Sequence, residues 1–343
     1  MLTIGFGQQK ADYKPALYFA AVTNSSTPHL VLVNLGTPEA PSPEAVREFL
    51  EEFLSDPAVV DLPRWLWLPI LHGMVLRSRP ARVSEQYASI WLPAGSPLRV
   101  GTQQLVRAVR DAAGPRFTVS EAYRYGEPSL DSTMQRVARE TEGPVIAVPL
   151  FPQRTEATTG TAFQCARKAA ARAGIGHRLV ERLIAPDDAG YVASLAVRWR
   201  EALANATRPP EHLVVSFHGI PVRYNRREKG IYVRDCETTT RAFLAAIEWP
   251  VERATLAYQS RFGPERWLTP ATATVLAELP GQGVKSMAVV TPGFLTDGLE
   301  TAEEIGIRGR ETFLSAGGEA FTRVPGVESE PSFVTSLCSL VVI

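Results

Sequence analysis

Short apolar runs alternate with longer stretches of helical periodicity along this chain. The apolar runs, bounded by glycine or proline, lie at residues 30–35, 145–150, 213–217 and 286–290. Helical patterns lie at residues 44–54, 98–113, 189–206 and 233–247. Buried strands that alternate with crossover helices are typical of parallel sheets with both faces covered. The pattern therefore predicts an α/β protein.

The chain also contains an internal repeat. Residues 29–38 align without gaps with residues 212–221, and each segment is an apolar strand that ends in Gly-x-Pro. A second matching pair, 145–152 and 286–292, follows later in each half. We expect two similar doubly wound halves with parallel, Rossmann-like sheets. Ligands of open α/β sheets bind beyond the carboxyl ends of the strands, so the active site should lie in the cleft between the halves.

The repeat suggests the domain organisation. We expect a first α/β domain at residues 28–176, a second at 177–327, and a tail at 328–343 that packs on the body as a helix or strand. Residues 1–27 are expected to be a poorly ordered extension, with a targeting peptide as the alternative. No run reaches about 18 consecutive apolar residues, so no membrane-spanning helix is expected.

Composition narrows the classes of function. The chain has 343 residues, with 36 Lys plus Arg and 36 Asp plus Glu, so its formal net charge is zero. Without a long basic run, nucleic acid is not an expected partner. Cys165, Cys236 and Cys338 stand singly, without the spacing of a zinc or iron–sulfur site. Such cysteines favour a reducing cytoplasm.

His218 is the main candidate for catalysis. It follows the apolar strand at 213–217 and precedes Gly219 and Pro221, so it should lie at a strand end that faces the cleft. An imidazole titrates near neutral pH and can accept a proton there. The matching position in the first half is Leu35. The structural alternative is a buried histidine that donates to a backbone carbonyl.

An acidic run beginning at Asp297 is the second candidate. We expect Asp297 to cap a helix by accepting from the free amides of its first turn. Glu300 would then hold the capping-box position, with Glu304 one turn further on the same face and Glu303 in solvent. Two inward carboxylates would share protons or a cation, and with His218 nearby they would suit a divalent first-row metal.

Seven segments between residue 30 and about residue 321 carry a family resemblance. They are residues 33–38, 95–98, 124–128, 216–221 with Arg223 and Tyr224, 259–263, 267–268, and 291–294 leading into 299–301. In this order they resemble the ferrochelatases, which insert ferrous iron into a porphyrin to make haem. Each segment is weak alone, but chance does not reproduce seven in order.

The resemblance implies an activity and a set of site residues. The activity would be that of a lyase that inserts Fe²⁺ into protoporphyrin IX, releases two protons and forms protohaem in the terminal step of haem biosynthesis. The family's essential histidine falls on His218 and its essential glutamate on Glu300, and these two would also be the residues that meet the metal. Glu304 and Arg124 would belong to a track for protons or metal. Whether His218 accepts a proton or binds iron stays open.

The resemblance also implies a porphyrin cleft with an apolar lip at residues 63–76, which would also contact a membrane from one side. Flat indoles around a cleft suit a macrocycle. The expected porphyrin contacts are Asn34, Leu35, Gly36, Thr37, Trp65, Trp67, Ile70, Tyr125 and Phe294.

The chain departs from the family in places. Gly298 stands where members usually have Cys or His, which removes a possible ligand or proton carrier. Residues 151–155 read Phe-Pro-Gln-Arg-Thr where many members have Tyr-Pro-Gln-Tyr-Ser. Three cysteines argue against the four-cysteine [2Fe–2S] cluster of some members. We therefore expect Fe²⁺ as a substrate and no prosthetic group, in a cytoplasmic monomer or homodimer that can lie at the inner membrane face.

Two alternatives remain. One is another tetrapyrrole chelatase, acting on coproporphyrin with iron or on a corrin precursor with cobalt. The other is a non-catalytic porphyrin or haem carrier, which is disfavoured because binding a ring requires neither His218 nor Glu300.

Overall fold

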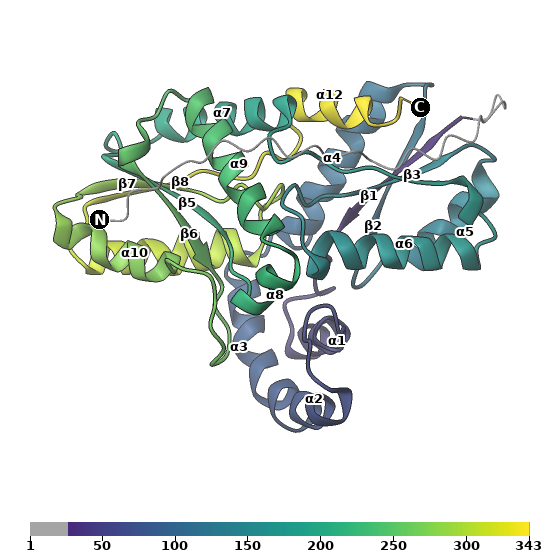
Figure 1. Cartoon of the computed structure of the whole chain (residues 1–343), viewed down its shortest axis with the longest axis horizontal. Coiled ribbons are helices and arrows are strands. Elements are labelled where there is room, and N and C mark those ends of the chain that lie inside the picture. The colour runs from purple at the N-terminus through teal and green to yellow at the C-terminus, as the bar shows by residue number, and fades with distance from the viewer. Residues whose placement is uncertain (1–26, 343) are drawn as a thin grey trace.

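Two four-stranded parallel sheets form the frame of the molecule (Figure 1). The computed structural model describes residues 27–342. The first sheet has the order β2–β1–β3–β4, and the second has the order β6–β5–β7–β8. The strands are β1 (His29–Asn34), β2 (Thr118–Tyr123), β3 (Val145–Pro149), β4 (Leu179–Glu181), β5 (His212–His218), β6 (Ala254–Gln259), β7 (Ser286–Val290) and β8 (Ala320–Arg323). Equal strand order in the two sheets confirms the α/β fold and the internal repeat.

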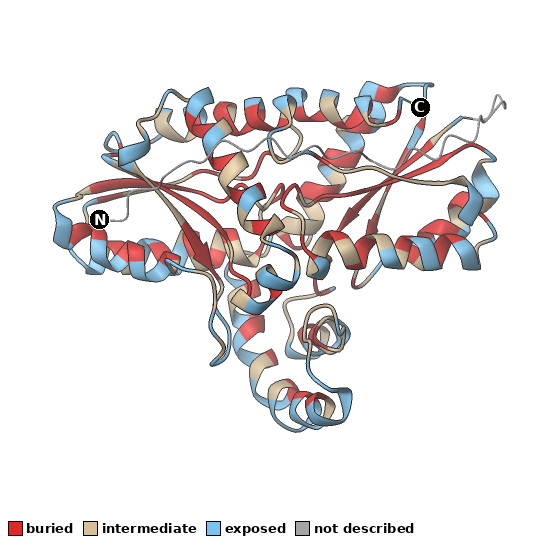
Figure 2. Ribbon diagram, in the orientation of Figure 1, coloured by how far each residue is buried: buried red, intermediate tan, exposed pale blue. Residues whose placement is uncertain are grey.

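Helices cover both faces of each sheet. One face of the pair is covered by α4 (Pro97–Ala113), α7 (Ala189–Ala204), α9 (Ile231–Ala246) and α12 (Pro331–Ser339). The other face is covered by α5 (Leu130–Glu140) and α6 (Thr161–Arg172) in the first half, and by α10 (Thr272–Glu278) and α11 (Arg310–Ser315) in the second. Figure 2 shows the strands as the most buried part of the molecule. Full burial on both faces explains why the strands are continuous apolar runs rather than alternating ones.

One apolar core crosses the boundary between the halves. It joins Leu30 and Leu105 of the first half to Leu213 and Phe243 of the second and to Phe333 of the C-terminal tail. All five side chains are fully buried. Because this core is shared, the halves are packed together on the face of α4, α7, α9 and α12.

The C-terminal tail contributes to this junction. It forms α12, which packs against α7 of the second half and α4 of the first. At the other boundary, β4 pairs with β3 in the first sheet. The first sheet therefore extends past the expected domain limit at residue 176, because the last strand of a half follows its last long helix. The expected extension at residues 1–27 lies outside the described residues, apart from Thr27.

A helical lobe projects from the first half beside the carboxyl ends of the strands (Figure 1). It consists of α1 (Pro43–Leu54), α2 (Arg64–Ile70), the π-helix η1 (Leu71–Val75) and α3 (Leu76–Ala88). The lobe has its own core, in which Trp67 is buried and donates its Nε1 hydrogen to Leu54 O at 2.7 Å. Trp67 therefore stabilises the lip from inside, whereas the indole of Trp65 is 79% exposed.

Short helices complete the fold. They are η2 (Glu156–Gly160), η3 (Gly176–Arg178), α8 (Val222–Arg227), η4 (Val251–Arg253), η5 (Leu279–Gln282) and η6 (Leu299–Gly309). Of these, η2 and η6 are π-helices, and both follow a central strand end. Within the described residues, no helix is long and apolar enough to cross a membrane.

Candidate active site

His218 is the last residue of β5 and lies at the carboxyl end of the second sheet. Its Nδ1 lies 2.6 Å from Gly219 O, and its ring centre lies 6.3 Å from that of Phe294. A carbonyl oxygen only accepts, so Nδ1 carries the proton in this contact. In a neutral imidazole with this tautomer, the lone pair is on Nε2, and that nitrogen can accept a proton or bind a metal.

Glu300 lies near His218 although 82 residues separate them in the chain. It is the second residue of η6, which begins soon after β7 ends. Burial raises the pKa of the Glu300 carboxyl, and the negative charge of Glu304 raises it further, while His218 and Arg79 oppose the shift. The strand-end rule and the acidic run thus lead to one region, where the Glu300 carboxyl has a raised pKa and lies close enough to His218 to interact with it electrostatically.

Glu304 is held at the end of the neighbouring strand. Its Oε1 accepts from the backbone N–H of Ser260 at 2.8 Å, and its Oε2 accepts from the Ser260 hydroxyl at 2.6 Å. Ser260 directly follows β6 and has a φ of 63°. The carboxylates of Glu300 and Glu304 therefore follow one another along η6, close to the ends of β5 and β6.

The expected cap at Asp297 is wrong. The helix begins one residue later, with Gly298 as the N-cap, and Gly298 donates its N–H to the Thr301 hydroxyl at 2.9 Å. Asp297 instead accepts from Thr301 Oγ1 at 2.9 Å and from Arg323 Nη1 at 2.6 Å. Arg323 lies on β8 and forms a charge-assisted hydrogen bond with Asp297. Such a bond is stronger than one from a neutral backbone amide, so Asp297 binds Arg323 instead of capping the helix.

The expectation that Glu303 lies in solvent is also wrong, because its side chain is only 7% exposed. Its two oxygens accept from Arg308 Nε and Nη2 at 2.8 Å each, and Gln86 of α3 donates to it at 3.3 Å. A bidentate arginine offsets the desolvation of a carboxylate that the lobe covers.

Arg124 is bound within the first half. It donates from Nε to Thr161 at 2.8 Å and forms a short ion pair with Asp56, which also accepts from the Tyr125 hydroxyl at 2.8 Å. Burial opposes ionisation of Asp56, but hydrogen bonds from Ala58 N, Tyr125 and Thr161 and the charge of Arg124 outweigh it and lower its pKa. The contacts of the described residues join Arg124 to Asp56 rather than to Glu304.

The end of β1 shapes the first-half wall. Asn34 is buried and donates to Thr102 at 2.9 Å and to Thr296 at 3.3 Å, which joins the two halves. Gly36 has a φ of 114°, and a Cβ there would lie 1.8 Å from Tyr125 O, so only glycine fits. Thr37 is buried as well. Of the remaining expected porphyrin contacts, Phe294 lies beside His218, whereas Trp65 and Ile70 are exposed on the lip.

Sequence reasoning missed the wall that α3 supplies. The Arg79 guanidinium lies 4.6 Å from the ring centre of Phe262, in the loop after β6. Burial lowers the pKa of Arg79, while the nearby charge of Glu300 opposes this. Tyr87 is buried, and burial together with the charge of Glu300 raises its pKa. Arg79 and Tyr87 have no sequence spacing that sets them apart from other residues of α3. Only the fold shows that they lie near Glu300.

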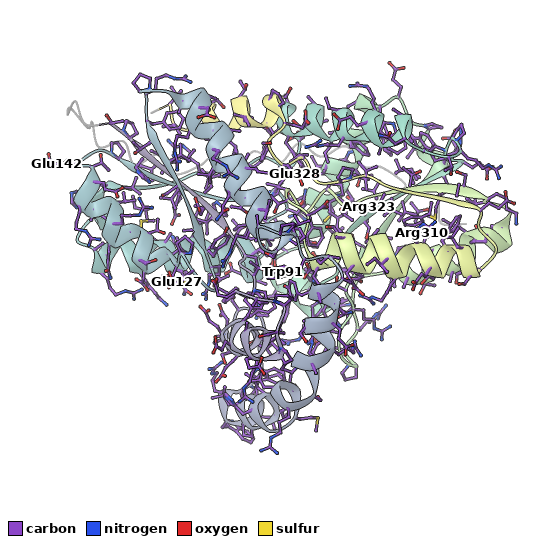
Figure 3. All side chains as sticks on the ribbon, turned by 180° about the vertical axis from the view of Figure 1, so that it is seen from behind. Trp91, Glu127, Glu142, Arg310, Arg323 and Glu328 are labelled. Atoms are coloured by element: carbon purple, nitrogen blue, oxygen red, sulfur yellow. The ribbon has the colours of Figure 1, made fainter. Side chains whose placement is uncertain are left out.

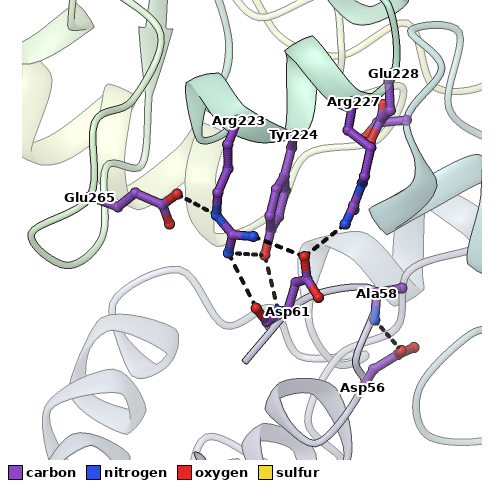
Figure 4. A network of polar contacts seen from close by, with 9 residues as sticks. Asp56, Ala58, Asp61, Arg223, Tyr224, Arg227, Glu228 and Glu265 are labelled. Atoms are coloured by element: carbon purple, nitrogen blue, oxygen red, sulfur yellow. Dashed lines mark hydrogen bonds and ion pairs between the residues drawn. The ribbon is translucent and has the colours of Figure 1, made fainter. Parts of the chain in front are cut away.

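A polar network ties the lip to the second half (Figure 4). Asp61 lies between α1 and α2, and its Oδ2 pairs with Arg223 at 2.8 Å and Arg227 at 2.7 Å. Its backbone N–H donates to the Tyr224 hydroxyl at 3.0 Å. Arg223 also pairs with Glu265 in the loop after β6. Asp61 thus joins the segment between α1 and α2 to α8, and Arg223 extends the network to the loop after β6.

A separate cavity of about 560 Å³ lies behind η6. Its lining includes Trp91, Arg323 and Glu328, which Figure 3 labels in the view from behind, and also Asp297. His218 and Glu300 do not line it. Within residues 27–342, no group of three or more His, Cys, Asp and Glu side chains is arranged to hold a metal ion.

The chain is similar to known proteins of one family. The profile of the family described as Ferrochelatase matches residues 29–342. A protein named Ferrochelatase from Pectobacterium atrosepticum is 39% identical over 321 residues, which cover 91% of this chain and 97% of the relative. A second Ferrochelatase, from Bordetella pertussis, is 41% identical over 317 residues, which cover 91% of this chain and 86% of the relative.

Two solved structures share the fold. One is the sirohydrochlorin chelatase SirB from Bacillus subtilis subspecies spizizenii in complex with cobalt, with a TM-score of 0.52, 10% identity, and coverage of 92% of this chain and 94% of that chain. The other is DR2241 from Deinococcus radiodurans, described as similar to chelatases, with a TM-score of 0.51, 16% identity, and coverage of 92% of this chain and 55% of that chain. The chelatase-like arrangement of two α/β halves is therefore confirmed.

Proposed function

This chain belongs to the ferrochelatase family, and we propose from that premise how its own residues carry out the reaction. The protein is a ferro-lyase that inserts iron into a porphyrin for haem synthesis. Fe²⁺ is a substrate of this reaction, and a carrier without catalysis does not fit the family.

The reaction must remove two protons from the ring. A free-base porphyrin carries two pyrrole N–H groups, and both protons leave as Fe²⁺ enters. We assign the first acceptor to His218, because its Nδ1 contact with Gly219 O leaves the Nε2 lone pair available. This contact is the observation that carries the proposal.

Glu300 would accept the second proton. Its pKa is raised by burial and by Glu304, which moves the carboxyl toward the range where it can both take up and release a proton near neutral pH. Glu304 lies further along η6, where Ser260 orients its carboxylate. The proposed track therefore runs from His218 and Glu300 to Glu304. Arg124 is left out of it and is proposed to hold the first-half wall through Asp56.

Protoporphyrin IX is the proposed ring. Coproporphyrin carries four carboxylates, whereas protoporphyrin carries two and has apolar vinyl groups. Arg124 and Arg154 follow the strand ends of the first sheet, and they pair with Asp56 and Asp235 respectively. Since these guanidinium groups already have carboxylate partners, they are poorly suited to receive two additional propionates.

An insertion assay tests these assignments. Purified protein is mixed with protoporphyrin and Fe²⁺ under anaerobic conditions, or with Zn²⁺, and loss of the free-base absorption is followed. We expect His218→Ala to lose nearly all activity and Glu300→Gln to lose roughly a hundred-fold in kcat. His212→Gln is the matched control, since His212 starts the same strand and bonds to Thr255.

Three outcomes would count against the proposal. A wild-type rate no higher than that of His218→Ala would overturn the catalytic role. A variant that mainly raises the KM for the metal would make His218 an iron ligand instead of a base. Faster turnover of coproporphyrin in a parallel assay would reverse the choice of ring.

We further propose that the lip contacts a lipid surface at the inner face of the membrane. Trp65 is 79%, Leu66 42% and Met74 68% exposed, and these side chains lie on adjoining helices of the projecting lobe. Arg64 and Arg77 flank the apolar segment. Exposed indoles and cations at its edges are suited to the headgroup region of an anionic bilayer.

A further inference from the structure

Gln259 is a buried residue that no catalytic role explains so far. It is the last residue of β6, is only 2% exposed, and lies opposite His218 in the parallel pair of β5 and β6. Its backbone carbonyl accepts from the N–H of Gly219 at 2.8 Å. The strand end that carries His218 is thus bound to Gln259 directly.

The side chain of Gln259 extends this connection to Glu300. Its Oε1 accepts from the Ser216 hydroxyl at 2.7 Å, and its Nε2 donates to the backbone oxygen of Glu300 at 2.7 Å. The orientation of the amide is determined, because the Glu300 carbonyl can only accept and must face the amide nitrogen. One side chain therefore joins β5 to the first turn of η6.

We infer that Gln259 is a positioning residue that sets the separation and orientation of His218 and Glu300. The inference rests on the catalytic roles proposed above for these two. Ser216 lies in β5 before His218, and Gly219 directly follows His218, so the bonds of Gln259 to these two residues bracket His218 along the chain. The third bond reaches the backbone of Glu300 itself.

The contacts require a glutamine. The site needs an acceptor toward Ser216 and a donor toward Glu300, at the length of a two-methylene side chain. Glutamate keeps the acceptor but loses the donor, methionine keeps the shape but loses both, and asparagine is one methylene shorter. The Ser216 hydroxyl is also 2.7 Å from Thr272 Oγ1, so Thr272 can donate to Ser216 while Ser216 donates to Gln259.

Gln259→Met tests the inference, with Thr255→Val as the matched control. Thr255 lies on the same strand and shares a hydrogen bond of 2.9 Å with His212 of β5, so its loss removes a part-buried bond between the same strands at their other end. We expect kcat of Gln259→Met to fall between roughly ten-fold and a hundred-fold, as misplacement of reacting groups by about 1 Å does. Porphyrin affinity, measured by fluorescence quenching, should stay within about three-fold of wild type, because the cleft walls are unchanged.

Two further variants separate the bonds. Gln259→Glu should be as impaired as Gln259→Met, because both lose the donor to Glu300. Ser216→Ala removes the hydroxyl's contacts with Gln259 and Thr272 but leaves the bond from Gln259 to Glu300, so it should lower kcat by a smaller factor. If Gln259→Met does not fold, Gln259→Glu and Ser216→Ala decide the question.

The alternative is a role in stability alone, in which kcat per folded molecule stays at the wild-type value in every variant. The inference would be overturned if Gln259→Met had the same kcat as Thr255→Val. If Gln259→Met does not fold, the same comparison is made with Gln259→Glu and Ser216→Ala. An inactive wild type would instead overturn the proposed function, so the two failures are distinct.

Discussion

At the scale of single residues, the fold shifts the pKa of one group of the candidate site and orients another through a hydrogen bond. Burial and Glu304 raise the pKa of Glu300, and the Gly219 carbonyl selects one tautomer of His218. Gly298 adjoins this pair, and a Cβ there would lie 3.4 Å from Glu300 Oε2, an ordinary contact distance. A Cβ at this position would therefore be tolerated, so the absence of a side chain at Gly298 is not imposed by lack of space for a Cβ.

His29 gives a prediction about stability and pH. It is buried between the Ser120 and Thr118 hydroxyls, and burial, with smaller effects from the charges of Arg136 and Arg110, lowers its pKa from 6.5 to about 4. The folded state favours neutral imidazole, so this contribution to stability is complete above pH 6.5 and is lost as the pH falls toward 4. The loss should amount to at most about 3 kcal/mol.

The measurement is the free energy of unfolding by urea between pH 4 and 7. His29→Leu cannot bind this proton, so its stability should depend less on pH over that interval although its overall stability is lower. Identical pH dependence in the two proteins would show that His29 is not held neutral in the fold.

At the scale of elements, periodicity located the helices well but not their type or their ends. The expected helices at residues 44–54 and 98–113 correspond closely to α1 and α4. The helix that carries Glu300 is instead a π-helix that starts at Leu299, one residue after the position expected from Asp297. Whether a side chain caps a helix depends on which hydrogen-bond donors lie within its reach. Here Arg323 of β8 donates to Asp297, and Asp297 does not cap the helix.

The lip gives a prediction at this scale. Trp65→Ser removes a large exposed apolar side chain from α2, and the variant should bind anionic phospholipid vesicles roughly ten-fold less well than wild type. Sedimentation with vesicles measures this. Val251→Ser is the matched control, since Val251 is 54% exposed but lies in η4 of the second half. Wild-type protein that does not bind such vesicles, or equal losses in both variants, would contradict the proposed membrane contact.

At the scale of the whole molecule, the two halves are fixed on one side and joined by polar contacts at the cleft. The shared apolar core and α12 hold the halves together on the face of α4 and α7. Near the cleft, Arg154 donates to both oxygens of Asp235 at 2.8 Å each, and Gln153 donates to Thr239 at 2.8 Å. The lobe, in contrast, meets the second half through the exposed ion pairs of Asp61 and through the hydrogen bond from Gln86 of α3 to Glu303. The halves are therefore packed through a buried core, whereas exposed ion pairs hold the segment before α2.

Asp61→Asn should loosen the lip without unfolding the protein. Exposed ion pairs are worth about 1 kcal/mol or less each, so the thermal midpoint should fall only slightly. Hydrogen exchange of residues 55–75 should become faster, because the lobe loses charged contacts with Arg223 and Arg227. Asp131→Asn is the control, since Asp131 forms an exposed pair with Arg172 between α5 and α6. Exchange in the lip that is equally slow in both variants would rule out this role of Asp61.

The sequence by itself determined the repeat, the parallel sheets and the strand end at His218, because these follow from hydrophobic periodicity and chain direction, which are local properties. The resemblance to the ferrochelatases likewise depends only on the order of seven short segments in the sequence. The family profile and the similar ferrochelatases confirm it. Gln259 belonged to one of those segments, yet nothing in its spacing marked it as the residue that joins His218 to Glu300.

The tertiary structure alone decided which side chains pair across the fold. Arg124 pairs with Asp56, Glu303 is buried against Arg308 and α3, and Arg79 and Tyr87 of the lobe lie near enough to Glu300 for its charge to affect their pKa values. Most of these partners lie tens to hundreds of residues apart in the chain. Whether a charge is solvated, capped or buried depends on what packs against it, and that is settled only when distant elements meet.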